Sequence, residues 1–405
     1  MNKKRLLTVL GGTEKKPLSG YSLWLSSLFG LSNPVSSWVD KSVNVNTVVQ
    51  ATADNQPAAL SNGVDFDGIN DSLAKTSPVL YEYESDVIQN GGFETYTGTA
   101  DDGTIDVFTG WVNVSTPGSG VVEAVTTVHG GSAAVKVTQA SGNGWLYQLI
   151  TVVPGQKRVL KFWTRGDGST AGRFRIYDNT NSADIVAYTS TGVAGTDYTF
   201  YQQIYTIPAG CTQVRLDFLN GAVASSSAYY DDVQDFELND LSISFWFKRL
   251  VDGSALVRQY MFCRTEGVAN RMWSFRFIGT GEGDDPNIGK TRFSLTKTGD
   301  STASGANTST VALINTWYHI AGTYQILTDG TSVIKVYVNG ALETTVANAV
   351  APIFYGTAPL SVGATSVVGS EHYFNGAIDE VLVYPSLLTL EQITAEYNRG
   401  KARHT

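Results

Sequence analysis

The sequence predicts an all-β protein, and three observations support that prediction. Only 16% of the 405 residues are charged, whereas an average globular protein carries about 25%. The chain is rich in residues of turns and strands, with 41 Gly, 8 Trp, 20 Tyr and 17 Phe. Short runs of alternating apolar and polar residues recur along it, and Asn-Gly pairs bound many of them. This combination favours strands joined by tight turns over helices.

Local patterns place the main elements. We expect strands within five ranges, 121–137, 159–163, 241–248, 333–339 and 377–383. Asn339-Gly340 tolerates the positive φ of a two-residue turn, so residues 333–343 should form a hairpin. One short helix is expected at the C-terminal end, over 389–397. Thr389 is its candidate N-cap, and Gln392, three residues on, completes a capping-box pattern.

Charge and hydropathy exclude two classes of partner. The formal net charge is −9 and the chain has no long basic run, so we expect no nucleic-acid partner. No window approaches the roughly 18 consecutive apolar residues of a membrane span, so we expect no membrane partner. The apolar run 6–10 is too short for the core of an export signal. We therefore expect synthesis in a host cytoplasm without a signal peptide.

Several ordered sequence blocks resemble one known family. The first blocks are Trp38-Val-Asp-Lys-Ser and residues 62–73, which contain a Phe-Asp-Gly tripeptide and an Asn-Asp pair. The later blocks are Leu241-Ser-Ile-Ser-Phe-Trp-Phe-Lys and residues 316–324, 335–340, 360–363 and 374–384. Together they resemble a LamG domain, a concanavalin A-like lectin sandwich. The resemblance implies a β-sandwich built from residues 36–85 and 236–400.

The stretch between these two segments resembles a second family. It contains Val87-Ile-Gln-Asn-Gly-Gly-Phe-Glu, the pair Gly110-Trp111, the block 129–137 and Tyr229-Tyr-Asp-Asp-Val. These residues resemble a carbohydrate-binding-module jelly roll. The first and last strands of a jelly roll lie side by side, so such a domain can be inserted into one loop of a host. We therefore expect an inserted jelly roll over 86–235, an N-terminal attachment arm over 1–35, and a tail over 401–405.

Two candidate sites follow from the inserted segment. Aromatic rings pack against sugar rings, and Trp145 with Tyr147, and Arg173 with Tyr177, alternate on two expected strands, which puts each pair on one face. We interpret these four residues as a candidate glycan-binding face. An ordinary polar sheet face is the alternative. Four other tryptophans, at 111, 163, 246 and 317, fall in strand-core blocks, where we expect burial.

The resemblance to the carbohydrate-binding module implies the second site. In such jelly rolls a structural Ca²⁺ bridges the first and last strands, and the matching positions are Glu94, Asp231 and Asp232, with carbonyls near Gly131. Solvated turn carboxylates without an ion are the alternative. In the LamG-like domain, Asp67 and Asp71 are expected to form Asx turns.

Catalytic patterns are not found in the sequence. Retaining glycosidases place two carboxylates on alternate residues of one strand, whereas Asp379 and Glu380 are adjacent and should point to opposite faces. His129, His319, His372 and His404 show no metal-ligand spacing. We therefore expect a binding protein rather than an enzyme.

These expectations combine into one functional hypothesis. The two resemblances also fit surface proteins of bacteriophage virions, which carry such sandwiches as capsid decorations, head fibres or tail-associated adhesins. This reading implies a structural or adhesive protein on the virion surface that binds glycans, contacts other virion proteins through the arm and forms a homo-oligomer. The alternative is a bacterial glycan-binding protein or an accessory domain of a glycan-degrading enzyme.

Overall fold

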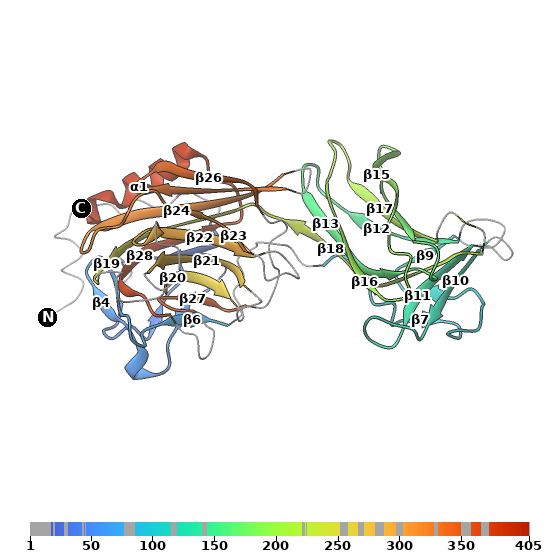
Figure 1. Cartoon of the computed structure of the whole chain (residues 1–405), viewed down its shortest axis with the longest axis horizontal. Helices are drawn as coiled ribbons and strands as arrows, with labels where there is room; N and C mark the ends of the chain where they lie inside the picture. The colour runs from blue at the N-terminus through green and yellow to red at the C-terminus, as the bar shows by residue number, and fades with distance from the viewer. Residues whose placement is uncertain are drawn as a thin grey trace. The chain divides into compact units, whose positions relative to one another are not determined.

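The computed structural model describes most of the chain (Figure 1). The described residues are 18, 21–27, 31–42, 44, 46–76, 86–114, 120–139, 144–220, 223, 225–251, 258–265, 271–279, 287–296, 303–327, 331–349, 358–365 and 372–404. Most of the expected N-terminal arm, including Lys3, Lys4 and Arg5, lies outside these residues, as does the loop 141–143.

The chain divides into two compact units. The host unit comprises 1–82, 240–327 and 331–405, and the inserted unit comprises 83–239 with 328–330. The host unit is therefore discontinuous in sequence. Its strand β5 (Gly63–Asp67) precedes the insertion and pairs with β28 (Asn375–Tyr384), which follows it.

Two eight-stranded sheets build the host unit. The first has the order β26-β25-β24-β19-β28-β5-β4, with β1 also paired to β28; its other strands are β1 (Leu23–Leu25), β4 (Ala58–Leu60), β19 (Leu241–Arg249), β24 (Trp317–Ile326), β25 (Ser332–Val338) and β26 (Ala341–Ala349). The second has the order β2 (Ser37–Trp38), β3 (Val48–Val49), β6 (Leu73–Lys75), β27 (Leu360–Val362), β20 (Arg258–Thr265), β21 (Arg271–Ile278), β22 (Thr291–Thr296) and β23 (Ala303–Asn307). A short 3₁₀ helix spans Ala53–Asn55.

Aromatic side chains fill the space between the two host sheets. Phe245 of β19 meets Phe275 of β21 edge-to-face at 5.1 Å, and Phe275 stacks on Phe293 at 4.5 Å. A Cβ at Gly322 of β24 would lie 2.6 Å from both Phe275 and Phe293. Glycine is therefore required there, because the backbone of one sheet directly contacts the rings of the other.

The inserted unit is a second sandwich of two five-stranded antiparallel sheets. The β13 sheet has the order β10 (Gly120–Val125), β11 (Ala134–Gln139), β18 (Ser227–Leu238), β13 (Lys157–Arg165) and β16 (Thr199–Thr206). The β14 sheet has the order β15 (Ala183–Ser190), β14 (Arg173–Asp178), β17 (Gln213–Leu219), β12 (Trp145–Thr151) and β9 (Val112–Asn113). A two-stranded ribbon joins β7 (Tyr96–Thr97) to β8 (Val107–Phe108).

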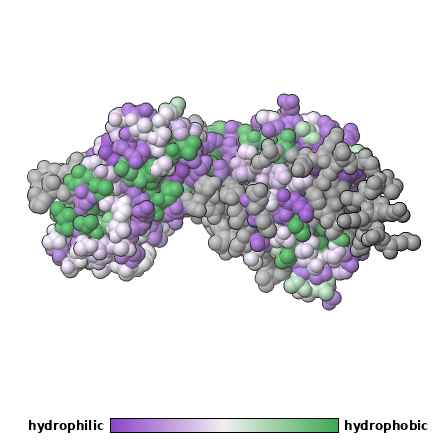
Figure 2. All heavy atoms as spheres, turned by 180° about the vertical axis from the view of Figure 1, so that it is seen from behind, coloured by the Kyte–Doolittle hydropathy of each residue, from purple (hydrophilic) through white to green (hydrophobic). Residues whose placement is uncertain are grey.

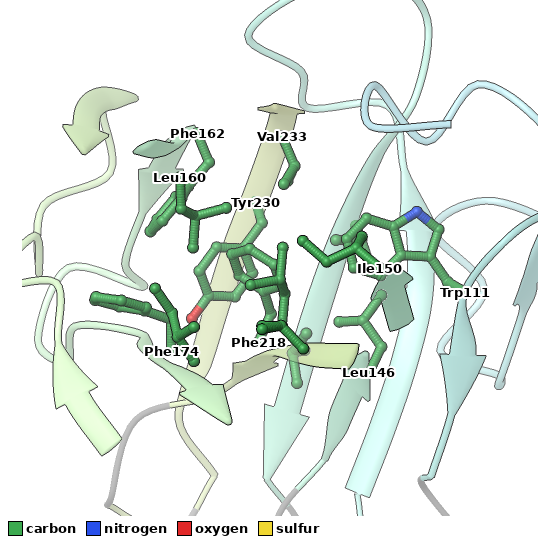
Figure 3. Close-up of a cluster of buried hydrophobic side chains, with 14 of the residues drawn as sticks. Trp111, Leu146, Ile150, Leu160, Phe162, Phe174, Phe218, Tyr230 and Val233 are labelled. Carbon is green, nitrogen blue, oxygen red and sulfur yellow. The ribbon is translucent and has the colours of Figure 1, made fainter. Parts of the chain in front are cut away.

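Alternate residues of these sheets form the core of the inserted unit. Figure 3 shows rings and aliphatic side chains from both sheets converging, with Phe162, Phe218 and Tyr230 near the centre. Phe162 meets Phe218 edge-to-face at 5.1 Å, and Phe218 meets Tyr230 at 4.9 Å. Such perpendicular ring pairs are favourable beyond the area they bury. Tyr230 also donates a hydrogen bond to the carbonyl of Arg173, which satisfies its buried hydroxyl.

The fold class and the local signals are confirmed. The regular structure of the described residues is almost entirely strand, with one α-helix, and all five expected strand ranges contain strands. Asn339 and Gly340 have φ of +50° and +80° in the β25–β26 hairpin. At the helix start, Gln392 N donates to Thr389 Oγ1 at 3.2 Å and Thr389 N to Gln392 Oε1 at 2.8 Å, which is a capping box. No helix within the described ranges is long and apolar enough to cross a membrane.

Two boundary predictions at the chain ends are wrong. Helix α1 spans Leu390–His404, so 401–404 are helical rather than a tail. Gly400 lies inside the helix and against Trp246, whose Nε1 is 2.2 Å from where a Cβ would stand, so a larger residue does not fit there. The expected arm also ends earlier than residue 35, since β1 pairs with β28 and Val35 is fully buried.

The tryptophan prediction is half right. Trp111 and Trp246 are buried, as expected. Trp163 and Trp317 are only half-buried. Trp163 stacks on His129 with centroids 3.7 Å apart, so its ring lies outside the core of the inserted unit. Alternation alone could not assign the face, because an aromatic residue suits either side of a strand.

Candidate functional site

One face of the β14 sheet gathers aromatic and arginine side chains from four strands. Strand register sets their positions, because Tyr147 of β12 lies opposite Asp217 of β17, which lies opposite Arg175 of β14. Two residues away on the same strands, Arg215 lies opposite Tyr177. We call this surface the aromatic–arginine face and define it by Trp145, Tyr147, Arg173, Arg175, Tyr177, Tyr188, Arg215 and Asp217.

Arg215 lies at the centre of the ring contacts. Its guanidinium carbon is 5.0 Å from the ring centroid of Trp145, 5.1 Å from that of Tyr147 and 4.9 Å from that of Tyr177. Trp145 and Tyr147 are themselves neighbours, with centroids 5.5 Å apart. Cations within about 6 Å of a ring face are attracted to it. The Arg215 guanidinium group therefore contacts all three rings, and the four side chains form one continuous surface.

Asp217 connects the two central arginines from below. Its Oδ1 accepts a hydrogen bond from Arg215 Nε at 2.7 Å, and its Oδ2 accepts one from Arg175 Nε at 2.7 Å. Burial raises the pKa of this fully buried carboxyl, and the two guanidinium groups oppose that shift. Arg175 also lies 4.4 Å from the Tyr177 ring and 4.3 Å from the Tyr188 ring. The guanidinium groups are thus held in fixed positions.

All four residues predicted for glycan binding belong to this face. Trp145, Tyr147, Arg173 and Tyr177 are half-buried, and Arg173 Nε donates to the carbonyl of Asn220 at 3.2 Å. Their role in binding stays a prediction. The prediction missed Arg215, Asp217 and Tyr188, and it left out Arg175, which lies on the same expected strand as Arg173 and Tyr177. The alternation of polar and apolar residues over 213–219 could have revealed Arg215 and Asp217.

Apolar side chains border the same face. Leu149 of β12 is 41% exposed, and Val112 of β9, opposite Tyr147, is 46% exposed. Figure 2 shows apolar residues reaching the surface of the protein in patches among polar ones. Exposed apolar and aromatic area next to fixed polar groups is typical of ligand-binding surfaces.

The three carboxylates predicted to bind Ca²⁺ surround one loop. Glu94 accepts hydrogen bonds from Ser132 N at 2.9 Å and from Ser132 Oγ, and these contacts hold its pKa below the usual value. Asp231 Oδ2 accepts from the backbone N–H of His129 at 2.8 Å, and Asp232 Oδ2 contacts His129 Nδ1 at 2.7 Å.

These contacts do not form a cation site. The carboxylate oxygens face N–H and O–H donors of the loop, whereas Ca²⁺ requires six to eight oxygen ligands. Among the described residues, no three His, Cys, Asp or Glu side chains are placed to hold one metal ion. The residues as placed do not fit the ion, and calcium stays an untested prediction. The expected Asx turn at Asp67 is present, with Oδ1 accepting from Ile69 N at 2.8 Å.

The predicted orientation of Asp379 and Glu380 is wrong. A β-bulge between β19 and β28 places one extra residue in β28, and Glu380 adopts φ +52°. Both carboxylates consequently reach Arg403 of helix α1. Bulges reorient side chains in this way. Both carboxylates are almost fully buried, and Arg399 binds Glu380 at 2.7 Å. This cluster anchors the helix.

Two family models match parts of the chain. Residues 220–394 match the family model Laminin_G_3, described as the concanavalin A-like lectin/glucanases superfamily. Residues 85–226 match the model CBM_4_9, described as a carbohydrate binding domain. Strands β1–β6 lie outside both matched ranges, although β5 pairs directly with β28. No curated protein matches the chain.

Solved structures show distant similarity. A heptameric SAP-like pentraxin from Limulus polyphemus is 13% identical over 38% of this chain and 68% of its own, with a TM-score of 0.30. TmCBM61, solved in complex with β-1,4-galactotriose, is 17% identical over 38% of this chain and 99% of its own, with a TM-score of 0.29. The botulinum neurotoxin serotype C1 binding domain is 17% identical over 40% of this chain and 37% of its own, with a TM-score of 0.30. The family models show that this all-β chain carries a concanavalin A-like lectin domain and a carbohydrate-binding domain.

Proposed function

We propose that the protein binds glycans through the aromatic–arginine face of the inserted unit. The observation that carries the proposal is the contact of one guanidinium group, that of Arg215, with three aromatic rings on a single sheet face. The match of residues 85–226 to a carbohydrate-binding family supports the same assignment.

The chemistry of the face suits a sugar chain. The C–H face of a pyranose packs against Trp145 and Tyr147, which lose little conformational entropy because each side chain has only two rotatable bonds. Guanidinium N–H groups donate hydrogen bonds to ring and hydroxyl oxygens. Binding requires no nucleophile and no paired acid and base. We therefore propose a binding role rather than catalysis.

Loss of one ring should test the proposal. In Tyr147→Ala, we expect the dissociation constant for bound glycans to rise about tenfold, because one ring contact contributes on the order of 1 kcal/mol. The measurement is isothermal titration calorimetry on the full chain, with ligands chosen from a glycan array.

A matched control uses an aromatic residue on the other sheet. Phe200 of β16 is 37% exposed and contacts Trp163, on the β13 sheet. Phe200→Ala should leave affinity unchanged. Equal losses in both variants, or no glycan bound by the unmodified chain, would contradict the proposal.

The location of this binding activity is a separate proposal. We propose that the protein is displayed on a bacteriophage virion, in contact with other virion proteins through its N-terminal arm and as a homo-oligomer. It rests on the expectation from the sequence that virion surface proteins carry such lectin-like and carbohydrate-binding sandwiches. The test is mass spectrometry of purified virions. Absence of the protein from the virions would contradict this location. Detection in a bacterial secretome would instead favour the alternative role as a bacterial glycan-binding protein.

A further inference from the structure

Helix α1 covers only part of the outer face of the first host sheet, the face that points away from the second sheet. The helix packs against β19, β24 and β26, and it ends at His404. Next to that end, strand register places three polar or aromatic side chains in one row. Lys248 of β19 lies opposite both Trp317 of β24 and Ala377 of β28, and Asp65 of β5 lies opposite Ala377 from the other side. We call Asp65, Lys248 and Trp317 the Trp317 row.

The ring of Trp317 extends across the sheet. Strands β24 and β5 are separated by β19 and β28, yet a Cβ at Gly63 of β5 would lie 3.0 Å from Cη2 of the Trp317 ring. Glycine at 63 therefore leaves room for the ring to lie on the strands between. His404 meets the ring edge-to-face, with centroids 4.6 Å apart. The ring is held in one orientation, and it remains partly exposed.

The carboxyl group of the row has no hydrogen-bond donor. Asp65 Oδ1 is buried and accepts no hydrogen bond, although the side chain as a whole is partly exposed. Burial raises the pKa of this carboxyl, and the charge of Lys248 opposes that shift. Buried polar atoms almost always have a partner, and a carboxylate without one costs stability. Local costs of this kind are typical of binding sites.

The ammonium group of the row is also without a polar partner. Within the described part of the chain, the Lys248 side chain forms no hydrogen bond and no ion pair, and its Nζ lies 5.4 Å from the centroid of the Trp317 ring. It is partly exposed, as is Asp65. The row thus presents one acceptor and one donor of opposite charge beside a fixed aromatic ring.

This set of groups matches the surface of a sugar residue. The C–H face of a pyranose packs on an indole ring, and a hydroxyl group both donates and accepts hydrogen bonds. Hydroxyl groups can therefore donate to Asp65 and accept from Lys248 at the same time. The charges of the two side chains are opposite, so an uncharged ligand fits the row without a counter-ion.

We propose that the Trp317 row is a second glycan-binding site, which takes one uncharged sugar residue on the Trp317 ring and holds its hydroxyl groups through Asp65 and Lys248. The site belongs to the host unit and goes beyond the function proposed for the aromatic–arginine face. A chain with both sites contacts a glycan-coated surface at two points, and linked sites bind more tightly than either site alone.

The test follows the Trp317 indole group directly. The full chain carries Tyr147→Ala, which weakens the aromatic–arginine face, and the Trp317 indole N–H signal is assigned in a proton–nitrogen NMR spectrum by its loss in Trp317→Phe. The probes are the methyl glycosides of glucose, galactose, mannose and N-acetylglucosamine, with glycerol as a polyol that has no sugar ring. We expect a saturable shift of this signal with at least one glycoside, at millimolar concentrations because one ring and two polar groups contact the sugar, and none with glycerol.

Variants of the two polar side chains locate the site. In Asp65→Asn and Lys248→Met, the affinity for that glycoside should fall about tenfold, because each change removes one charge-assisted hydrogen bond. Asp65→Asn should leave the thermal unfolding temperature unchanged or raise it, because the carboxylate has no partner to lose. The matched control is Lys335→Met in β25 of the same sheet, where the lysine is also partly exposed, and it should leave the affinity unchanged.

Each outcome decides for or against the second site. A saturable Trp317 shift that weakens in Asp65→Asn and Lys248→Met, but not in Lys335→Met, supports it. No Trp317 shift with any of the four glycosides overturns it and leaves the proposed function standing, because calorimetry on Tyr147→Ala and the unmodified chain tests that function separately. A shift that glycerol reproduces, or that Lys335→Met weakens equally, reveals non-specific contact and overturns it. A lower unfolding temperature in Asp65→Asn assigns Asp65 a structural role and also overturns it.

Discussion

Each of the two sandwiches carries the same irregularity in a long strand. In the host unit, a bulge in β28 opposite β19 places Glu380 at φ +52°, next to Asp379. In the inserted unit, a bulge in β18 opposite β13 places Asp232 at φ +48°, next to Asp231. In each unit, the two adjacent carboxylates therefore do not point to opposite faces of the sheet. Both contact one neighbouring segment, which is helix α1 in the host unit and the loop with His129 in the inserted unit.

The neighbouring strand repeats the similarity. Trp246 lies opposite Asp379 and stacks on His404 at 4.5 Å, with 11° between the ring planes. Trp163 lies opposite Asp231 and stacks on His129 at 3.7 Å, with 12° between the planes. In each unit the histidine also contacts a bulge carboxylate.

What covers the two bulges differs. Helix α1 brings Arg399 and Arg403 over the host bulge, and Ser27 N donates to Asp379 at 2.8 Å from the N-terminal side. The loop that carries His129 covers the inserted bulge, where the Asp232 side chain is 41% exposed. The same backbone irregularity thus supports a buried ion-pair network in one unit and a partly exposed contact in the other. Burial of the partners, rather than the bulge, decides how much each contact stabilises.

The largest expected effect comes from removing the cation over the host bulge. Arg403→Met leaves Asp379 and Glu380 buried with one partner fewer, so we expect a loss of about 3–5 kcal/mol in the free energy of unfolding. His129→Ala, the matched change at the inserted bulge, should cost about 1 kcal/mol or less because its contact with Asp232 is partly exposed.

Equilibrium urea unfolding of both variants is the measurement. Arg403→Lys, which keeps the charge but not the paired geometry, should give an intermediate loss. Equal losses in the free energy of unfolding for Arg403→Met and His129→Ala would contradict the expected difference between the two bulges.

Acidification should affect the two units in opposite directions. Burial lowers the pKa of His319 in the host unit to about 3, so the unfolded host takes up a proton below pH 6.5 that the folded host does not. Between pH 7 and pH 5, the host should lose about 2 kcal/mol. Burial raises the pKa of Asp235 in the inserted unit to about 6. The folded inserted unit therefore takes up the proton first and gains about 1 kcal/mol over the same range.

Differential scanning calorimetry at pH 7 and pH 5 measures this effect. Arg403→Met assigns the host transition, because it should lower that transition alone. On acidification the host transition should move down in temperature and the other should move up. A parallel shift of both would contradict the assignment of these two buried groups.

The smallest effect concerns backbone strain. A side chain at positive φ costs roughly 1–2 kcal/mol, which glycine avoids. Asp232→Gly gives up one partly exposed contact, so we expect a net change between zero and about 1 kcal/mol of stabilisation. Glu380→Gly also relieves strain, yet it removes a buried partner of Arg399, of Arg403 and of Ser26 and should destabilise. Thermal unfolding of the two variants measures these changes in stability. A change of the same sign in both variants would contradict the comparison.

Sequence reasoning succeeded where the signal is local. Asn339-Gly340 and the pair Thr389 and Gln392 each satisfy their own backbone, so the hairpin and the helix start could be predicted. The bulge that turns Asp379 and Glu380 to one side arises from pairing with a strand more than 130 residues away in sequence. No alternation rule contains that information.

The candidate face shows the same division. Alternation placed Trp145 and Tyr147 on one face, and Arg173 and Tyr177 on one face, as the structure has them. That the strand with Arg215 and Asp217 lies between these two strands follows only from the sheet order β14-β17-β12. The helix was expected over 389–397, whereas α1 continues to His404 through Gly400, a residue of low helix propensity. The contact of Gly400 with Trp246, which leaves no room for a side chain, comes from strand β19 and cannot be seen in the local sequence.

The connection between the units has a mechanical consequence. Strand β18 of the inserted unit ends at Leu238 and β19 of the host begins at Leu241. Tension from a tethered ligand therefore enters the host in part along β19, which lies between β24 and β28 in the middle of its sheet. The other end of the insertion follows β6, which lies between β3 and β27. Hydrogen bonds on both sides of a strand pulled along its length resist together, in shear, rather than separating one after another. Both ends of the insertion thus lead to interior strands of the host rather than to edge strands.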